Sequence, residues 1–281
     1  MCKALCIRKI KMSFTLPLKS NYRWSKCKTA PANGISIEER RHHDDFDVTE
    51  IKISGVEGAV DTCVFFSDLH WLGDAPELYQ RVAKAINSSN SDWILFGGDA
   101  CAYMDTMDGA LEWMGTLKAR KGKLAVLGNR EAHIKWHSMA FWKLAYAEAG
   151  FELLVNESKD AGAFYFYGVD DYRYGRPDWN NIPNGRFCIS LSHNPDAVAD
   201  YDGNVGNLAL CGHTHGGQLV LPVIGPLYTS SKYGRQFLQG MCVRDDGTVE
   251  YTSSGIGESG FGLLHRRIRC PREMLRIRFV E

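Results

Sequence analysis

The sequence lacks three features that would assign it to a class at once: a C-x-x-C cysteine pair, a long apolar run and an excess of charge. The nine cysteines, an odd number, argue against a disulfide framework or a thiolate zinc site. No stretch approaches the roughly 18 to 20 apolar residues of a spanning helix, so membrane insertion and export are not expected. The 33 basic and 33 acidic residues balance, which disfavours a nucleic-acid partner. We therefore expect a cytoplasmic protein in a reducing compartment.

The length of 281 residues, with 44% hydrophobic and 23% charged residues, predicts one large domain plus an extension. Residues 1–50 begin with a basic stretch that has no acidic residue before Glu38. We expect this segment to be a solvated, partly disordered extension and residues 51–281 to form the domain. A second reading makes it a basic arm in peripheral contact with anionic lipid, with Phe14, Tyr22 and Trp24 as interfacial anchors.

From about residue 51, short apolar runs alternate with amphipathic stretches, which is typical of an α/β fold. The runs at 64–66, 93–96 and 124–127 predict strands, and residues 76–86 predict a helix with proline in its first turn. The second half is richer in strands. These are predicted at 163–169, 187–191, 208–210, 218–221, 241–244, 249–253 and 275–280. The alternation at 276–279 predicts a half-exposed edge strand.

Residue types that bind metals follow five of these predicted strands. They are Asp68, His70, Asp99, Asn129, His193, His213 and His215. Open α/β sheets place ligand sites at the carboxyl ends of their strands, so these side chains are expected to meet. Carboxylate oxygen and imidazole nitrogen suit manganese, iron and zinc. One carboxylate, Asp99, could bridge two ions roughly 3.5 to 4 Å apart, the spacing used in phosphoryl transfer.

The ordered motifs D-x-H, G-D, G-N-x-[DE], a lone histidine and G-H-x-H resemble the calcineurin-like metallophosphoesterase superfamily, in its bacterial phosphodiesterase branch. The resemblance covers about residues 51–281. It implies a four-layer α-β-β-α sandwich and a metal-dependent hydrolase of phosphodiester or pyrophosphate bonds in small molecules. It also implies two divalent ions, with manganese first and zinc or iron as alternatives. Asp68, His70 and His215 would hold one ion, Asn129, His193 and His213 the other, and Asp99 would bridge them.

Arg130 departs from the family pattern, which usually has histidine at this position. Arginine cannot donate a proton, since its pKa exceeds about 12, but its guanidinium can bind phosphoryl oxygens. A phosphate leaving group departs without protonation, so Arg130 favours pyrophosphate cleavage. The same motif resembles UDP-2,3-diacylglucosamine pyrophosphatases of lipid A biosynthesis, which makes a UDP-linked lipid precursor the specific expectation. The alternative is a general phosphodiesterase, weakly active or differently tuned, that acts on nucleotides or phospholipid head groups.

Three further points stay open on sequence alone. Tyr103 could contact substrate or simply pack at a helix start, and Trp71 could face a base or acyl chain or cap the core. Some members of this fold are non-catalytic protein-binding scaffolds that have lost metal ligands. All seven ligand positions here hold competent donors, which favours an enzyme.

Overall fold

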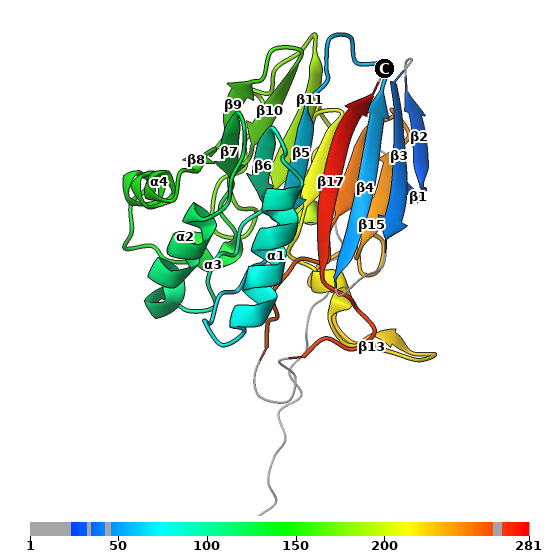
Figure 1. Ribbon diagram of the computed structural model, residues 1–281. Helices are drawn as coiled ribbons and strands as arrows, with labels where there is room; N and C mark the ends of the chain where they lie inside the picture. Colours follow the sequence, from blue (N-terminus) through cyan, green and yellow to red (C-terminus); the bar gives the residue numbers. More distant parts are fainter. Residues whose placement is uncertain (1–23, 33–34, 43–45, 261–265, 281) are drawn as a thin grey trace, which may run out of the picture.

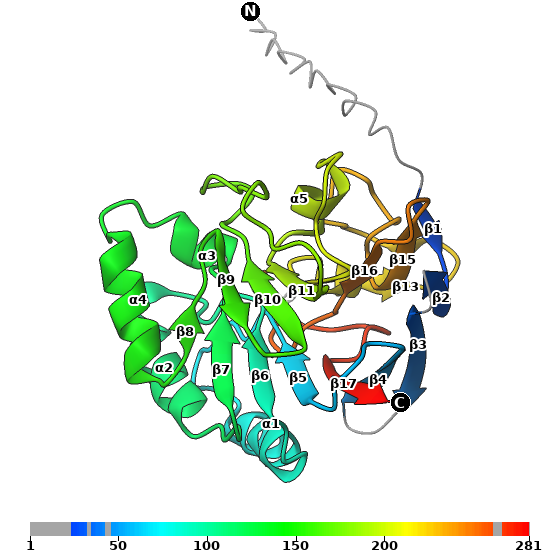
Figure 2. The same ribbon diagram turned by 90° about the horizontal axis from the view of Figure 1, so that it is seen from above.

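Two β-sheets pack face to face and form the body of the molecule (Figures 1 and 2). The structure, a computed structural model, describes residues 24–32, 35–42, 46–260 and 266–280. The predicted mixed α/β sandwich is confirmed. Among the described residues, no helix is both long and apolar enough to cross a bilayer.

The first sheet has eight strands. From one edge to the other they are β2 (Thr29–Ala32), β3 (Ile35–His42), β4 (Asp47–Ser54), β17 (Glu273–Val280), β5 (Thr62–Phe66), β6 (Trp93–Phe96), β7 (Gly122–Ala125) and β8 (Glu152–Leu153). Strands β5 to β8 run parallel to one another. Strands β5 and β6 are buried on both faces, which explains their apolar runs.

The second sheet has seven strands. In order they are β1 (Trp24–Lys26), β15 (Gly240–Arg244), β16 (Val249–Thr252), β12 (Leu208–Cys211), β11 (Phe187–Ser192), β10 (Phe164–Gly168) and β9 (Glu157–Asp160). The four strands β10, β11, β12 and β16 are parallel. A separate small hairpin joins β13 (Val220–Leu221) to β14 (Gly225–Pro226).

The helices divide unequally between the outer faces of the two sheets. The outer face of the eight-stranded sheet is covered by α1 (Pro76–Ser88), α2 (Met107–Gly115) and α4 (Met139–Glu148) (Figure 2). Helix α1 begins at a proline and buries Tyr79, Val82 and Ile86, one helical stripe. The outer face of the other sheet is covered by the short helix α5 (Pro195–Ala199) and the segment 170–185.

The N-terminal part of the chain differs from the expected extension. The expected boundary at residue 50 falls inside β4, and strands β1 to β3 precede it in the sheets. Phe14 and Tyr22 lie outside the described residues, while Trp24 opens β1, opposite Arg244 of β15. The described residues from Trp24 onward therefore belong to the sandwich.

Strand β17 also differs from its predicted place at a sheet edge. It lies between β4 and β5, pairing with β4 along its whole length and with β5 over residues 275–278. Its alternating burial arises because one face meets the layer between the sheets, while Arg276 and Arg278 point to the other face. The last strand of the chain thus connects the N-terminal strands to the central parallel ones.

The layer between the two sheets is apolar. One sheet contributes Ile51, Phe65 and Ile277, and the other contributes Phe166 and Leu210, all with no exposed surface. This core fixes the two sets of parallel strands against each other. Their carboxyl ends consequently meet at one end of the sandwich, the lower end in Figure 1.

Candidate metal centre

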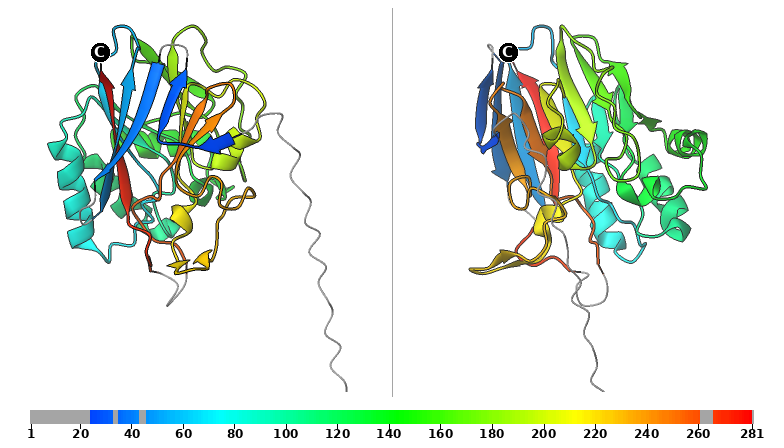
Figure 3. Two further views of the ribbon diagram at one scale, coloured as in Figure 1. Left: turned by 90° about the vertical axis from the view of Figure 1, so that its right-hand side faces the viewer. Right: turned by 180° about the vertical axis from the view of Figure 1, so that it is seen from behind.

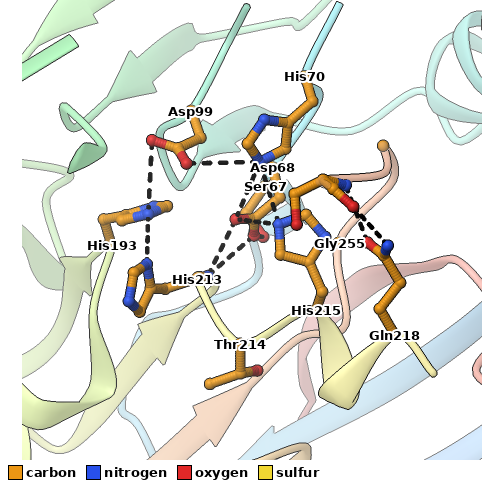
Figure 4. Close-up of polar contacts among 12 residues, drawn as sticks. Ser67, Asp68, His70, Asp99, His193, His213, Thr214, His215, Gln218 and Gly255 are labelled. Atoms are coloured by element: carbon orange, nitrogen blue, oxygen red, sulfur yellow. Dashed lines mark hydrogen bonds and ion pairs between the residues drawn. The ribbon is translucent and has the colours of Figure 1, made fainter. Parts of the chain in front are cut away.

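Loops at this end of the sandwich carry all seven predicted metal ligands. Asp68 and His70 follow β5, and Asp99 follows β6. Asn129 starts the short helix α3 (Asn129–Ala132) after β7. His193 follows β11. His213 and His215 follow β12, the latter opening the 3-10 turn η2 (His215–Gly217). Six of the seven side chains converge in Figure 4, and Asn129 joins them through a contact with His193.

The first cluster gathers Asp68, His70 and His215. The Nε2 atoms of His70 and His215 lie 3.0 Å apart, and His215 Nε2 is 3.4 Å from Asp68 Oδ1. Their ligand atoms lie within 4.8 Å of one another, and all three residues are buried. Buried nitrogen and oxygen atoms facing one another at these distances present mainly lone pairs, which a divalent cation satisfies.

The second cluster gathers His193, Asn129 and His213. His193 Nε2 lies 3.1 Å from Asn129 Oδ1 and 3.1 Å from His213 Nδ1. His193 Nδ1 is 2.8 Å from the Gly97 carbonyl oxygen, which only accepts, so Nδ1 carries the proton of this bond. That bond leaves Nε2 facing the cluster with its lone pair, the orientation that a metal-bound histidine needs.

The Asp99 carboxylate lies between the clusters. Its Oδ2 is 3.4 Å from His70 Nε2, and its Oδ1 is 3.5 Å from His193 Nε2. Asp68 belongs to two sets of residues whose ligand atoms lie within 4.8 Å of one another. The first set is Asp68, His70 and His215, and the second is Asp68, Asp99 and His193. The donor set therefore fits two divalent ions side by side, with Asp99 able to reach both.

The backbone of the centre is strained. Asp68, His70, Asp99, His213 and His215 all have positive φ, between 41° and 70°. Each such residue costs on the order of 1 kcal/mol, since a Cβ clashes in this region. Left-handed residues break the strand alternation, so Asp68 and His70 face the same ion site although they are only two residues apart.

Two glycines allow the loops to approach the carboxylates. A Cβ on Gly128 would lie 2.2 Å from Asp99 Oδ1, and a Cβ on Gly212 would lie 2.3 Å from Asp68 Oδ2. Any larger residue would displace a carboxylate oxygen. The glycines of the G-N-x-[DE] and G-H-x-H motifs are thus required by close packing.

Protein hydrogen bonds fix the carboxylates in place. Ser67 Oγ donates to Asp68 Oδ2 at 2.6 Å, and the His213 amide donates to both oxygens of Asp68. The Arg130 amide donates to Asp99 Oδ1 at 2.8 Å. Both carboxylates are therefore oriented by the chain itself.

Burial sets the protonation of the centre. It lowers the pKa of His70, His213 and His215 well below the ordinary value, so these imidazoles are neutral and able to coordinate. Burial also raises the pKa of Asp99, to about 7. Burial alone would lower the pKa of His193, but the negative charges of Asp99 and nearby carboxylates outweigh burial and raise this pKa to about 9. The carboxylates around His193 thus favour positive charge at this place.

Glu131 is a positioning residue that the sequence reasoning missed. Its fully buried carboxylate accepts the amides of Asp99 at 3.2 Å, Ala100 at 2.6 Å and Gly128 at 3.0 Å. The two loops after β6 and β7 are thereby tied together, with Asp99 on one and Asn129 on the other. The acidic position of the G-N-x-[DE] motif was the available signal.

Arg267 is a second residue that was missed, because it lies in the basic stretch 265–269, whose composition is typical of a solvent-exposed segment. Its guanidinium donates to the carbonyls of Ser254 at 2.7 Å and Gly257 at 2.5 Å. Nη2 also lies 3.5 Å from Nδ1 of His215. Arg267 therefore holds the 254–257 loop beside the first cluster.

The remaining predicted residues lie in two different environments. Arg130 and the exposed Tyr103 line a cavity of about 380 Å³ that also contains Asn129 and Tyr174. This cavity opens directly beside the second cluster, since Asn129 belongs to both. Trp71 instead stacks on Tyr79 with ring centroids 4.1 Å apart and packs, partly buried, against the core under the helices.

Comparison with known proteins identifies the family. The family described as calcineurin-like phosphoesterase matches residues 62–217, more than half of the chain and all seven ligand positions. The chain belongs to this family. It is similar to the uncharacterized metallophosphoesterase YkuE of Bacillus subtilis, with 32% identity over 69% of this chain and 71% of that protein. Phosphodiesterase YaeI of Escherichia coli is 25% identical over 77% of this chain and 81% of its own length. A dimetal phosphatase from Danio rerio superposes with a TM-score of 0.45 at 12% identity, covering 70% of this chain and 88% of that one.

Membership in this family defines the general chemistry. The protein is a metal-dependent hydrolase of phosphoesters, and its two candidate ligand sets, one of Asp68, His70 and His215 and one of Asp68, Asp99 and His193, suit two divalent ions. The resemblance expected from the motifs is confirmed at the level of the superfamily.

Proposed function

We propose that the protein is a two-metal phosphodiesterase acting on small phosphoesters. The observation that carries the proposal is the Asp99 carboxylate, whose two oxygens face His70 on one side and His193 on the other. In this proposal Asp68, His70 and His215 hold one ion, Asn129, His193 and His213 hold the other, and Asp99 bridges them. Manganese is the first choice, with zinc or iron as alternatives, because the donors are imidazole, carboxylate and amide.

Two divalent ions held by these residues would supply an activated water molecule and neutralise charge on the phosphoryl group. The chain supplies the rest. Ser67 and the His213 amide keep Asp68 in position, and Glu131 keeps the loops of Asp99 and Asn129 in position. Arg130, in the cavity wall beside Asn129, is assigned to bind the phosphoryl oxygens. Tyr103 and Tyr174 line the same cavity and are assigned to the organic part of the substrate.

A phosphodiester is favoured as the substrate class because YaeI, similar over 77% of this chain, is named a phosphodiesterase. Hydrolysis of a pyrophosphate bond is the second candidate, favoured by Arg130, which offers charge but no proton to the leaving group. A UDP-linked lipid precursor such as UDP-2,3-diacylglucosamine belongs to this second candidate. None of the three proteins compared above is named for that substrate.

A reducing, cytoplasmic setting and a small-molecule substrate complete the proposal. The described cysteines are free thiols, and most are buried in apolar surroundings. The balanced net charge gives no general attraction for nucleic acid.

The test is phosphorus NMR on manganese-loaded protein, incubated separately with a simple aryl phosphodiester and with UDP-2,3-diacylglucosamine. Turnover of the diester supports the proposal. Release of UMP from the lipid nucleotide alone would replace it with the pyrophosphatase alternative. Turnover of neither would contradict both and support a scaffold. We expect the Arg130→His variant to gain activity on the aryl diester, because histidine restores a proton donor for the leaving aryloxide.

A further inference from the structure

The β13–β14 hairpin projects from the body at the end that carries the metal centre (Figures 1 and 3). It starts five residues after His215. Residues 219–228 form a continuous uncharged stretch of ten residues that contains the whole hairpin. Within the described part of the chain, the two strands pair with each other and with no further strand, apart from a backbone contact between residue 219 and Ile268 at the hairpin base.

The tip of this hairpin is apolar and exposed. The relative exposures are 107% for Val223, 60% for Ile224, 55% for Leu227 and 68% for Tyr228. Four large apolar side chains within six residues form a patch, unlike the single exposed apolar residues of an ordinary surface. An exposed apolar patch on a segment that projects from the body indicates an interaction site.

The surroundings of the hairpin are basic. There is no acidic residue from 203 to 244 or from 259 to 272. Arg235 donates to the Ile224 carbonyl at 2.5 Å and so lies against the hairpin. Arg266 and Arg269 are exposed on either side of Ile268, whose backbone is hydrogen-bonded to Gln218 and Val220 at the hairpin base. An apolar tip is therefore flanked by guanidinium groups.

We propose that the β13–β14 hairpin docks on an anionic phospholipid bilayer, with its tip in the acyl region and the arginines at the head groups. Aliphatic side chains enter the apolar phase, tyrosine suits the interface, and arginine pairs with lipid phosphates. A second copy of the chain fits less well, because two such faces would bring basic groups together. The docked hairpin holds the metal centre next to the membrane surface.

Vesicle sedimentation of the full chain tests this proposal and does not depend on any enzymatic activity. The protein is mixed with vesicles of phosphatidylcholine and phosphatidylglycerol, or of phosphatidylcholine alone. We expect binding to the anionic vesicles, weaker binding to the neutral ones, and about a tenfold loss for the double variant Val223→Ser, Ile224→Ser. The double variant Arg266→Gln, Arg269→Gln should lose binding to a similar extent, because each arginine contributes to attraction at the surface.

The matched control is the double variant Val60→Ser, Val280→Ser, which removes two exposed apolar side chains at the opposite end of the sandwich. It should bind as the unmodified protein does. Residues 1–23 are identical in all variants, so any difference reports on the hairpin. Thermal unfolding by circular dichroism checks that each variant is folded. Equal vesicle binding by the hairpin variant and the control would overturn the proposal. So would concentration-dependent self-association that disappears in the hairpin variant without vesicle binding.

Discussion

The metal centre and the layer between the sheets are both shielded from solvent, yet their residues differ in kind. Between the sheets, side chains such as Ile51, Phe65 and Leu210 are apolar and lie in regular strands. At the metal centre, buried carboxylates and imidazoles lie on left-handed backbone. The first arrangement gains free energy by removing apolar surface from water, whereas the second pays desolvation and strain. The interior between the sheets therefore stabilises the fold, and the metal centre uses part of that stability.

The largest expected effect comes from removing the bridging charge. Asp99→Asn keeps the shape of the side chain but removes its charge and replaces one of the two oxygens that face the clusters with an NH₂ group. We expect activity on an aryl diester to fall by about 10³-fold, equivalent to about 4 kcal/mol, as the bridge loses its charge and one of its two ligand oxygens. The stability of the metal-free protein should not fall, because a buried charge is removed. His213→Ala should also lose most activity.

The measurement is steady-state kinetics with denaturant unfolding of the same preparations. Asp245→Asn, an exposed position in the turn between β15 and β16, makes the same chemical change away from the centre and should leave both quantities unaltered. Full activity in Asp99→Asn would refute the assignment of this residue as the bridge.

The reverse pattern is expected between the sheets. Ile51 lies in β4 and has no exposed surface. Ile51→Ala should lower the free energy of unfolding by about 3 kcal/mol, since it leaves a cavity. Activity below the unfolding transition should stay close to that of the unmodified protein. Val60→Ala, at an exposed site, should change stability by no more than about 0.5 kcal/mol. A loss of activity in folded Ile51→Ala would show that the two regions are coupled.

Glu131→Gln probes the boundary between the two regions. The carboxylate accepts three amide protons with two oxygens, and glutamine would turn an NH₂ group toward one of them. We expect metal affinity to weaken by about 10- to 100-fold, since residues that orient ligands act on this scale. Manganese titration calorimetry measures this, with Glu112→Gln on the exposed face of α2 as the matched control. Unchanged affinity would show that the loops are positioned without this carboxylate.

Sequence patterns predicted the parts of the molecule that depend on neighbouring residues. The apolar run at 64–66 predicted a strand directly before Asp68, and β5 is present there. The place of β17 could not be predicted, because its pairing with β4 joins residues more than 200 positions apart. Glu131 was missed for a related reason: its partners at Asp99 and Ala100 come from a different strand loop. Long-range pairing is set by the whole core and leaves little local trace.

Glu250 provides the finest comparison, because it is a buried carboxyl outside the metal centre. It lies in β16 and contacts the Thr252 hydroxyl. Burial raises its pKa from the ordinary 4.5 to about 8, so in the folded protein it is a neutral acid at pH 7. The folded state then holds a proton that the unfolded state releases above pH 4.5. From this site, the free energy of unfolding should fall by about 1.4 kcal/mol per pH unit up to about pH 8.

In Glu250→Gln this contribution should vanish, because an amide does not titrate. Urea unfolding of both proteins between pH 5 and about pH 9 gives the two slopes, and Glu112→Gln should keep the original one. If Glu250→Gln and the unmodified protein showed the same slope, the Glu250 carboxyl would be ionised in the folded protein at neutral pH, which would contradict its assignment as a neutral acid. The difference in slope thus measures how a buried acid behaves where no cation site is built around it. It separates the effect of burial on a carboxyl pKa from the effect of the imidazoles that surround Asp68 and Asp99.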